Sequence, residues 1–387
     1  MLEEPTFEFG SAGIYVHVPF CLRKCLYCDF VSYPAVPDEM NAYFKALVRE
    51  IQIVADQLSQ VSVTSAYLGG GTPSALPTAM LCGILSHIRA AFNLDSHAEI
   101  SAEINPGTLE AVDLAAVAAA GVNRLSIGVQ SLDDGLLQRL GRVHTAGEAV
   151  DSIRAARAAG FQNINIDLMF GLPGQSLSDL RQTVDRVIEL APEHISCYSL
   201  IVEPTTPLAK QLEKRELELP DEDLELAMYE WVMARLHAAG YEHYEISSWA
   251  RPGYRSRHNE LYWRNEWYRG LGPAAHSHWD RQRWANAPTV KAYSQALDQG
   301  VLPVVERCQL SADDEMDETM IMGLRLLEGV SEERFRTRYG RGLEATYGPE
   351  IVRLVRLGLV EYGSSLRLTR KGLLIANQVF AAFLRSP

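Results

Sequence analysis

Short apolar runs alternate along the chain with longer segments whose apolar positions recur every three or four residues. The short runs predict strands at 14–20, 63–69, 99–105, 124–130, 163–170 and 194–202. The longer segments predict amphipathic helices, for instance over 38–58, 177–190 and 221–239. This alternation is typical of an α/β protein in which repeated βα units build a parallel sheet.

A local repeat supports this interpretation. The stretches AAAGVNRLSI, RAAGFQNINI and HAAGYEHYEI each end an alanine-rich helix at a glycine, namely Gly121, Gly160 or Gly240, and then begin a strand. Glycine suits the position after a helix because it adopts the left-handed conformation without a Cβ clash. Six βα units are too few for a closed eight-fold barrel. We therefore expect an open, partial (β/α)6 barrel over residues 1–250.

Two further regions follow the predicted barrel. Residues 251–310 are rich in aromatic residues, Arg, His and Gly, and we interpret them as a connecting region. Residues 311–387 show helices, a short hairpin with a Gly-Ser turn and a last helix, which is a winged-helix-like α+β order. This segment holds 11 basic and 11 acidic side chains. Packing against the barrel is therefore favoured over DNA binding.

Charge and composition exclude several classes of function. The 387 residues carry a formal net charge of −13, which disfavours binding to nucleic acids or anionic membranes. The first ten residues are acidic and lack a signal-peptide core, and no apolar run is long enough for a transmembrane helix. We expect a cytoplasmic protein. Three of its six cysteines are clustered, which indicates a metal or redox site rather than a disulfide framework.

The cluster lies in CLRKCLYCDF, which places Cys21, Cys25 and Cys28 in the loop after the first strand. Barrel folds build their sites at this end of the strands. One interpretation is a zinc site whose fourth ligand is His17 or Cys82. A [4Fe–4S] cluster explains three cysteines better, because three thiolates leave one iron open for a small molecule.

This spacing, together with motifs at successive strand ends, resembles the radical S-adenosylmethionine superfamily. The resemblance implies that the open iron binds S-adenosylmethionine. It implies cofactor contacts in GGGTPS, AEINP, GVQS, LGRVH and DLMFGLPGQ, at Gly70, Gly71, Thr72, Glu103, Gln130, Arg142 and Asp167. Tyr15 and Tyr27 match aromatic positions that flank the cofactor in this superfamily. Each could equally be a packed core residue.

Within the superfamily, the chain resembles the branch that contains oxygen-independent coproporphyrinogen III dehydrogenase. It departs from that enzyme at Phe30, where the enzyme has a further cysteine, and only 20 residues precede Cys21. HNELYW, residues 258–263, fits the H-N-x-x-Y-W signature of the HemW-type haem chaperones. The resemblance implies haem as a further cofactor, with His258 as a candidate binding residue. Alternatively, His258 and Asn259 form a structural hydrogen-bonded pair and the aromatic residues belong to the core.

Two functions follow from the resemblance. The favoured one is a haem chaperone without turnover, a homodimer that delivers haem to acceptor respiratory proteins, with any membrane contact made through the acceptor. The alternative is a radical enzyme that decarboxylates porphyrinogen propionates to vinyl groups. Radical methyl transfer that opens the haem ring is a related option, and no residue singles it out.

Overall fold

The computed structural model describes residues 11–385, so the first ten residues, in which no targeting segment is expected, lie outside it. Its centre is a curved sheet in which the six predicted strands lie side by side and run parallel. In spatial order they are β1 (Ser11–Val18), β4 (Ser62–Gly70), β5 (Leu94–Ile104), β6 (Arg124–Gln130), β7 (Ile164–Phe170) and β8 (His194–Ser199). The predicted partial barrel is confirmed.

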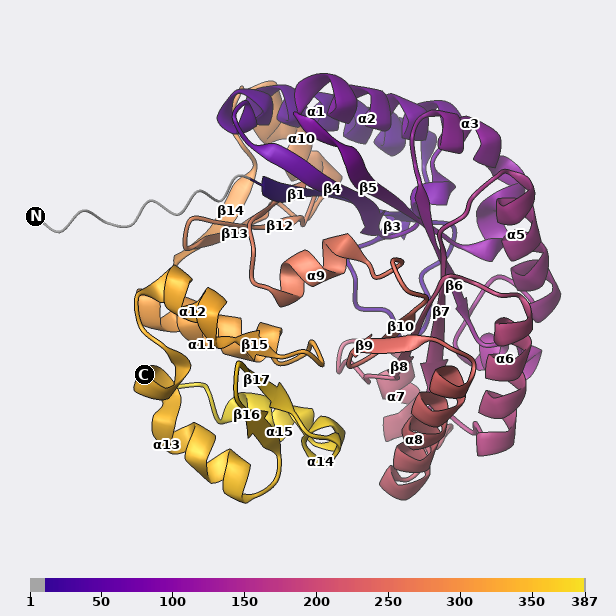
Figure 1. The fold of residues 1–387 in the computed structure, drawn as a ribbon. Coiled ribbons are helices and arrows are strands. Elements are labelled where there is room, and N and C mark those ends of the chain that lie inside the picture. The colour runs from indigo at the N-terminus through magenta and orange to yellow at the C-terminus, as the bar shows by residue number, and fades with distance from the viewer. Residues whose placement is uncertain (1–10, 386–387) are drawn as a thin grey trace, which may run out of the picture.

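Helices cover the outer side of this sheet, as Figure 1 shows. They are α1 (Pro37–Ala55), α2 (Thr78–Ala91), α3 (Leu114–Ala119), α5 (Ala146–Ala158), α6 (Leu177–Glu189) and α8 (Glu222–Ala238). The short helices α4 (Asp134–Arg139) and α7 (Pro207–Glu213) pack instead against Leu26 of the cysteine loop, in a smaller apolar cluster. The repeated glycines follow α3, α5 and α8 with positive φ angles, 106° at Gly121, 95° at Gly160 and 81° at Gly240. Each therefore ends its helix in the way the repeat predicts.

Residues 251–310 extend the barrel sheet instead of linking two units. β11 (Tyr268–Leu271) pairs with β1 in parallel, and three antiparallel strands follow it: β12 (His276–Trp279), β13 (Gln282–Asn286) and β14 (Val304–Gln309). At the other edge, β10 (Ser248–Ala250) and β9 (Glu242–Glu245) continue the sheet beyond β8. Two helices complete the region, α9 (Arg257–Trp263) and α10 (Val290–Asp298). The predicted boundary at residue 250 thus falls inside one continuous sheet.

A fully buried carboxylate on α1 holds this extension in place. Glu50 accepts hydrogen bonds from the Gly272 N–H (2.7 Å), from the Asn286 side-chain amide (2.7 Å) and from the Tyr293 hydroxyl (2.5 Å). Burial raises the pKa of Glu50, while these three donors act in the opposite direction. One side chain of the first helix therefore satisfies buried donors from three segments that follow more than 200 residues later.

The last segment forms a module with a hydrophobic core of its own. It contains α11 (Ala312–Gly323), β15 (Val330–Ser331), α12 (Glu332–Tyr339), α13 (Leu343–Arg356), β16 (Val360–Tyr362), β17 (Ser365–Leu368), α14 (Arg370–Leu374) and α15 (Ala376–Ala381). The hairpin β16–β17 turns at Gly363 and Ser364, as the sequence predicts. The winged-helix-like order is thus confirmed, and the module lies below α9 in Figure 1.

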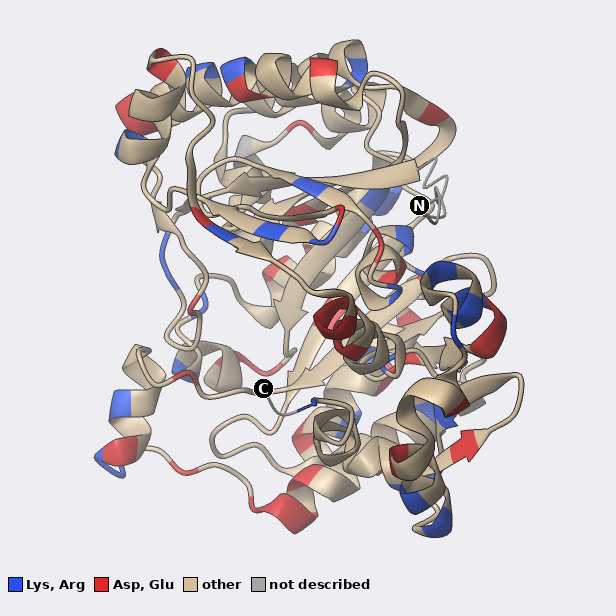
Figure 2. Ribbon diagram, turned by 90° about the vertical axis from the view of Figure 1, so that its left-hand side faces the viewer, with Lys and Arg blue, Asp and Glu red and all other residues tan. Residues whose placement is uncertain are grey.

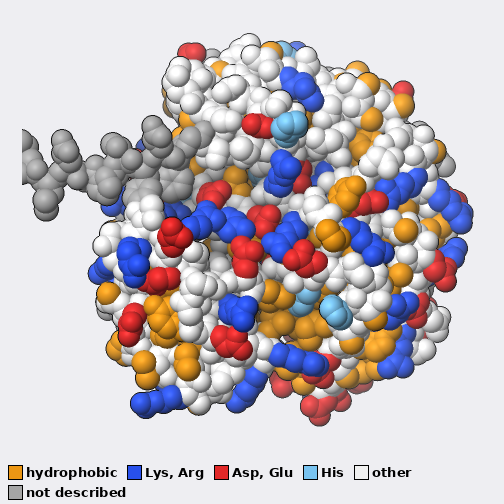
Figure 3. Space-filling model, viewed as in Figure 1, with side chains coloured by type: hydrophobic (Ala, Val, Ile, Leu, Met, Phe, Trp, Pro, Cys, Tyr) orange, Lys and Arg blue, Asp and Glu red, His pale blue; other side chains and the backbone are white. Residues whose placement is uncertain are grey.

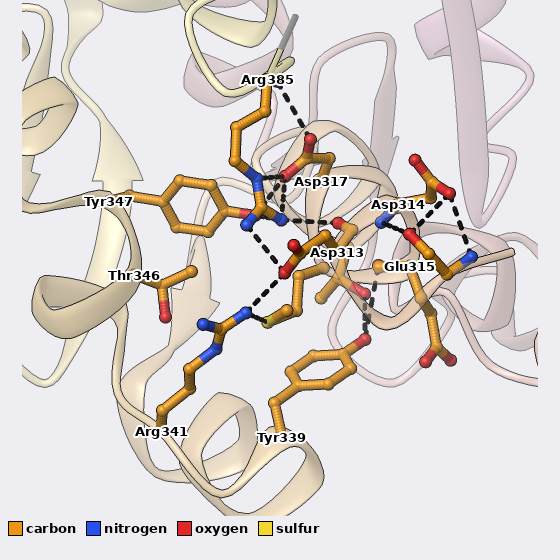
Figure 4. A network of polar contacts seen from close by, with 12 residues as sticks. Asp313, Asp314, Glu315, Asp317, Tyr339, Arg341, Thr346, Tyr347 and Arg385 are labelled. Atoms are coloured by element: carbon orange, nitrogen blue, oxygen red, sulfur yellow. Dashed lines mark hydrogen bonds and ion pairs between the residues drawn. The ribbon is translucent and has the colours of Figure 1, made fainter. Parts of the chain in front are cut away.

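An ionic network ties the end of the chain to the first turns of α11 (Figure 4). The Arg385 guanidinium contacts Asp313 at 2.9 Å and Asp317 at 2.6 Å, and the Tyr347 hydroxyl donates to Asp317 at 2.6 Å. Arg341 contacts Asp313 from α12's C-terminal side at 2.6 Å. The acidic start of α11 is therefore neutralised within the module.

Acidic and basic residues are interspersed over the helices in Figure 2, and the face in Figure 3 mixes both signs as well. Within residues 11–385, no helix combines the length and the apolar character that crossing a membrane requires.

Candidate functional site

A pocket opens at the carboxyl ends of the parallel strands and gathers most of the predicted site residues. It is lined by residues from all the motifs at the strand ends: Cys21, Cys25, Tyr27, Cys28, Gly70, Gly71, Thr72, Glu103, Gln130, Arg142 and Asp167. These residues are up to 146 positions apart in the sequence (167 − 21), and the parallel sheet brings them to one edge.

The cysteine loop is held at both ends by the barrel. The short strands β2 (Phe20–Cys21) and β3 (Tyr33–Pro34) pair, and the His17 imidazole contacts the Val31 carbonyl at 2.8 Å. Arg142 donates to the Cys25 sulfur at 3.4 Å, and the Thr72 hydroxyl lies 3.5 Å from the Cys21 sulfur. The Cys21 and Cys25 thiols are thus contacted from two different strand ends, and all three cysteines line one pocket.

The donor set fits an iron–sulfur cluster better than a single zinc ion. Among the described residues, no three His, Cys, Asp or Glu side chains are placed around one metal ion. Of the proposed fourth ligands, His17 bonds Tyr15 and Val31 through its two ring nitrogens, and Cys82 lies on α2 against the Ala116 carbonyl. A cluster needs no convergence on one point, because each thiolate binds a different iron. Cys21, Cys25 and Cys28 would hold it.

The glycine turn after β4 packs directly against the cysteine loop. A Cβ on Gly70, whose φ is +103°, would lie 2.4 Å from the His17 ring, and one on Gly71 would lie 2.6 Å from the Val18 carbonyl oxygen. The Gly71 and Thr72 amides donate to the carbonyls of Val18 (2.8 Å) and Phe20 (2.7 Å). Glycine is therefore required here by the packing of the two loops as well as by any cofactor.

Two carboxylates form the inner wall of the pocket. Glu103 accepts from the Tyr67 hydroxyl at 2.9 Å and from the Gly70 N–H at 3.1 Å. Burial, with a smaller contribution from Asp167, raises the pKa of Glu103 to about 7. Asp167 accepts from Ser126 and Asn165, both at 2.8 Å, and burial raises its pKa too. The wall therefore offers two hydrogen-bond acceptors, and a charged group placed beside them would change their protonation.

Arg142 and Gln130 complete the polar lining. Arg142 donates to the Gly128 carbonyl at 2.6 Å, while its buried Nε has no hydrogen-bond partner among the described residues. Gln130 accepts from the Tyr198 hydroxyl at 3.1 Å and has a φ of +65°, at a bulge in β6. A strained non-glycine residue and an orphaned donor in one pocket are typical of a ligand site.

Tyr15 and His258 lie behind the pocket lining instead of in it. The Tyr15 hydroxyl bonds the His17 Nδ1 at 3.0 Å. His258 is fully buried, with Nδ1 2.8 Å from the Ser65 hydroxyl and Nε2 2.8 Å from the Tyr262 hydroxyl. Burial lowers the pKa of His258 to about 3, so the ring is neutral. In this arrangement both ring nitrogens of His258 already have a hydrogen-bond partner.

Several residues that line or support the pocket are not among the site residues predicted from the sequence. Ser126 and Tyr198 lie on predicted strands, β6 and β8, and face inward. The signal that could have found them is the alternation of inward and outward positions along each strand. Tyr67 and Asn165, which bond the two carboxylates, lie two residues or more before the strand ends and carry no motif.

Comparisons with known proteins agree with this architecture. Residues 15–187 match the radical SAM superfamily, and residues 310–375 match the HemN C-terminal domain. Coproporphyrinogen III oxidase (HemN) from Escherichia coli, described as a radical SAM enzyme, superposes with a TM-score of 0.82 at 26% identity, covering 96% of this chain and 89% of that one.

Relatives of nearly the same length are more similar in sequence. The heme chaperone HemW of Bacillus subtilis is 38% identical over 372 residues, covering 96% of this chain and 98% of the relative. The heme chaperone HemW of Escherichia coli is 35% identical, with coverage of 96% and 98%. The chain therefore belongs to the radical SAM superfamily and, within it, to the family of the haem chaperone HemW.

Proposed function

We propose that this protein is a haem chaperone that carries a [4Fe–4S] cluster on Cys21, Cys25 and Cys28, with S-adenosylmethionine on the open iron. It binds haem and delivers it to acceptor respiratory proteins, acting as a homodimer. Two lines of support are the names of the relatives and the cysteine pocket with its inner carboxylates. When bound, the cluster would supply the open iron, and Gly70, Gly71, Thr72, Glu103 and Asp167 would hold the rest of the cofactor.

The observation that carries haem binding is the apolar rim of this pocket. Phe30 lines the pocket and is 61% exposed, although it is a large aromatic residue. Leu22, in the same loop, is 55% exposed, and Ile201, just beyond β8, is 71% exposed. Leu22 and Ile201 lie on the two segments that contribute Phe30 and Tyr198 to the pocket lining, and exposed apolar side chains near a pocket support a binding surface there. A haem presents a flat apolar face and two anionic propionates. Arg23 and Lys24 lie at the same mouth, where they donate to the Gly141 and Phe30 carbonyls and could pair with the propionates.

The competing function is oxidation of coproporphyrinogen, which the likeness to HemN favours. The two are separated by giving anaerobically reconstituted protein S-adenosylmethionine, a reductant, and either haem or coproporphyrinogen. We expect stoichiometric haem uptake, transfer to an apoprotein acceptor, and no divinyl product. Multiple turnovers to a divinyl porphyrinogen would refute the chaperone.

The rim can be tested separately. Phe30→Ser should weaken haem binding while the cluster still assembles, because Phe30 is not a thiolate ligand. Val352→Ser is the matched control, since Val352 is 50% exposed on α13 in the C-terminal module. Equal haem affinity in both variants would remove the rim from the proposed site.

A further inference from the structure

Helix α9, which carries the HNELYW motif, lies on the inner side of the barrel. It contacts β1 and β4 on one side and α11 of the C-terminal module on the other (Figure 1). Its first turn is fixed by Glu99 at the beginning of the regular part of β5, whose carboxylate accepts from the Arg257 and His258 amides, each at 3.2 Å. The motif therefore sits at the opposite end of the barrel interior from the cysteine loop.

A first chain of contacts leads from α9 to the pocket. The His258 ring is held by Ser65 and Tyr262 and stacks on the Tyr67 ring, with 5.2 Å between centroids and 24° between planes. The Tyr67 hydroxyl in turn donates to Glu103 at 2.9 Å. Because stacking restricts the plane of the Tyr67 ring, His258 helps to set where that hydroxyl points, together with Tyr15, whose ring stacks on the same residue at 6.3 Å.

A second chain starts at Ser256, the residue that caps α9. The Ser256 N–H donates to the Tyr244 hydroxyl (3.3 Å), which lies 2.8 Å from His194 Nε2. His194 Nδ1 lies 2.6 Å from the Asn165 oxygen, and the Asn165 amide donates to Asp167 at 2.8 Å. With the His194 proton on Nδ1, every hydrogen bond in the chain points toward the Asp167 carboxylate.

The far side of α9 is held by the C-terminal module. Arg264, the residue after the helix, pairs with Glu328 at 2.7 Å. Arg338 on α12 donates to the Asn265 carbonyl at 2.9 Å, and Arg334 pairs with Glu266 at 2.6 Å. Both the motif and the helix cap are thus fixed between the module and the two pocket carboxylates.

We propose that α9 is a positioning element for the S-adenosylmethionine pocket, and that His258 acts through Tyr67 on Glu103 instead of binding haem iron. This inference rests on the proposed binding of S-adenosylmethionine at that pocket. In this arrangement the HNELYW motif positions the two carboxylates of the pocket wall, and the C-terminal module holds α9 in place.

The test measures binding of S-adenosylmethionine and of haem to the anaerobically reconstituted full chain. Tyr67→Phe should weaken S-adenosylmethionine binding at least roughly tenfold, the lower end of the loss expected for one hydrogen bond to a charged group. His258→Ala should weaken it in the same direction and by no more, because it releases the Tyr67 ring without removing that hydroxyl. Haem affinity should not change. Tyr241→Phe is the matched control, because it also removes one buried tyrosine hydroxyl, bonded to the Pro192 carbonyl, outside both chains.

A double-mutant cycle separates positioning from a general loss of stability. In a Glu103→Gln background, His258→Ala should have little further effect on S-adenosylmethionine binding, because the group on which it acts is already altered. Independent, multiplying losses, or a loss of haem binding with S-adenosylmethionine binding intact, would overturn the inference. If His258→Ala does not fold, Tyr67→Phe takes its place in the cycle with Glu103→Gln, and the same two outcomes are compared. Wild-type protein that binds no S-adenosylmethionine would refute the proposed function itself.

Discussion

The sharpest single prediction concerns Glu103, the carboxylate on the pocket wall. Glu103→Gln keeps the shape of the side chain but removes its charge and one of its acceptor oxygens. The remaining amide cannot accept from both Tyr67 and Gly70 and also serve a ligand hydroxyl. A hydrogen bond to a charged group contributes about 1.5–3 kcal/mol, so the dissociation constant of S-adenosylmethionine should rise roughly 10- to 150-fold.

The affinity for S-adenosylmethionine should also depend on pH through the same carboxyl group. The pKa of Glu103 is raised to about 7, and only the ionised carboxylate accepts hydrogen bonds through both oxygens. Wild-type affinity should therefore fall as the pH drops through 7, by roughly tenfold between pH 8 and pH 6. Folding stability responds in the opposite direction. Because the folded pKa lies above the ordinary 4.5, stability decreases as the pH rises from about 4.5 to about 7 and then levels off.

Equilibrium dialysis of S-adenosylmethionine against reconstituted protein from pH 6 to pH 8 measures both effects. The visible absorbance of the cluster, recorded in each sample, shows that Glu103→Gln still carries it. The variant should bind weakly and with a flat profile. A slope that survives in Glu103→Gln would belong to the ligand or to another residue, and it would refute the assignment of the carboxylate.

Further predictions concern assembly and stability. Cys25→Ser should abolish the visible absorbance of the cluster, and bound zinc in the wild type would sink the cluster assignment. Gly70→Ala should lower the yield of reconstituted cluster, because alanine is strained at φ +103° and its Cβ would meet His17. Glu50→Ala should lower the free energy of unfolding by about 3 kcal/mol or more, because it leaves three buried donors unpaired, whereas Lys45→Ala, exposed on the same helix, should change it by less than about 0.5 kcal/mol. Asp317→Ala should destabilise the C-terminal module by about 2 kcal/mol through Tyr347 and Arg385, and a denaturation curve identical to that of the wild type would contradict this.

The barrel strands were predictable from the sequence because they are buried on both faces and therefore appear as continuous apolar runs. The same reasoning fails for residues 251–310. β11 to β14 are four to six residues long, and β11 joins the sheet by pairing with β1, more than 250 positions earlier. No local pattern encodes such a pairing, so the region appeared to be a connection. The pocket residues at strand ends were predictable because each follows a strand of the βα repeat, and a parallel sheet places all these strand ends at one edge.

His258 shows that a sequence motif does not reveal which way a side chain points. To reach haem iron, this imidazole would have to leave Ser65 and Tyr262, at a cost of about 1–3 kcal/mol for each buried partner left unpaired. The total for the two partners, about 2–6 kcal/mol, is a large part of the stability of many domains. The inward position is therefore the low-energy one, which agrees with the proposal that haem binds at side chains that already face solvent, such as Phe30 at the mouth of the pocket.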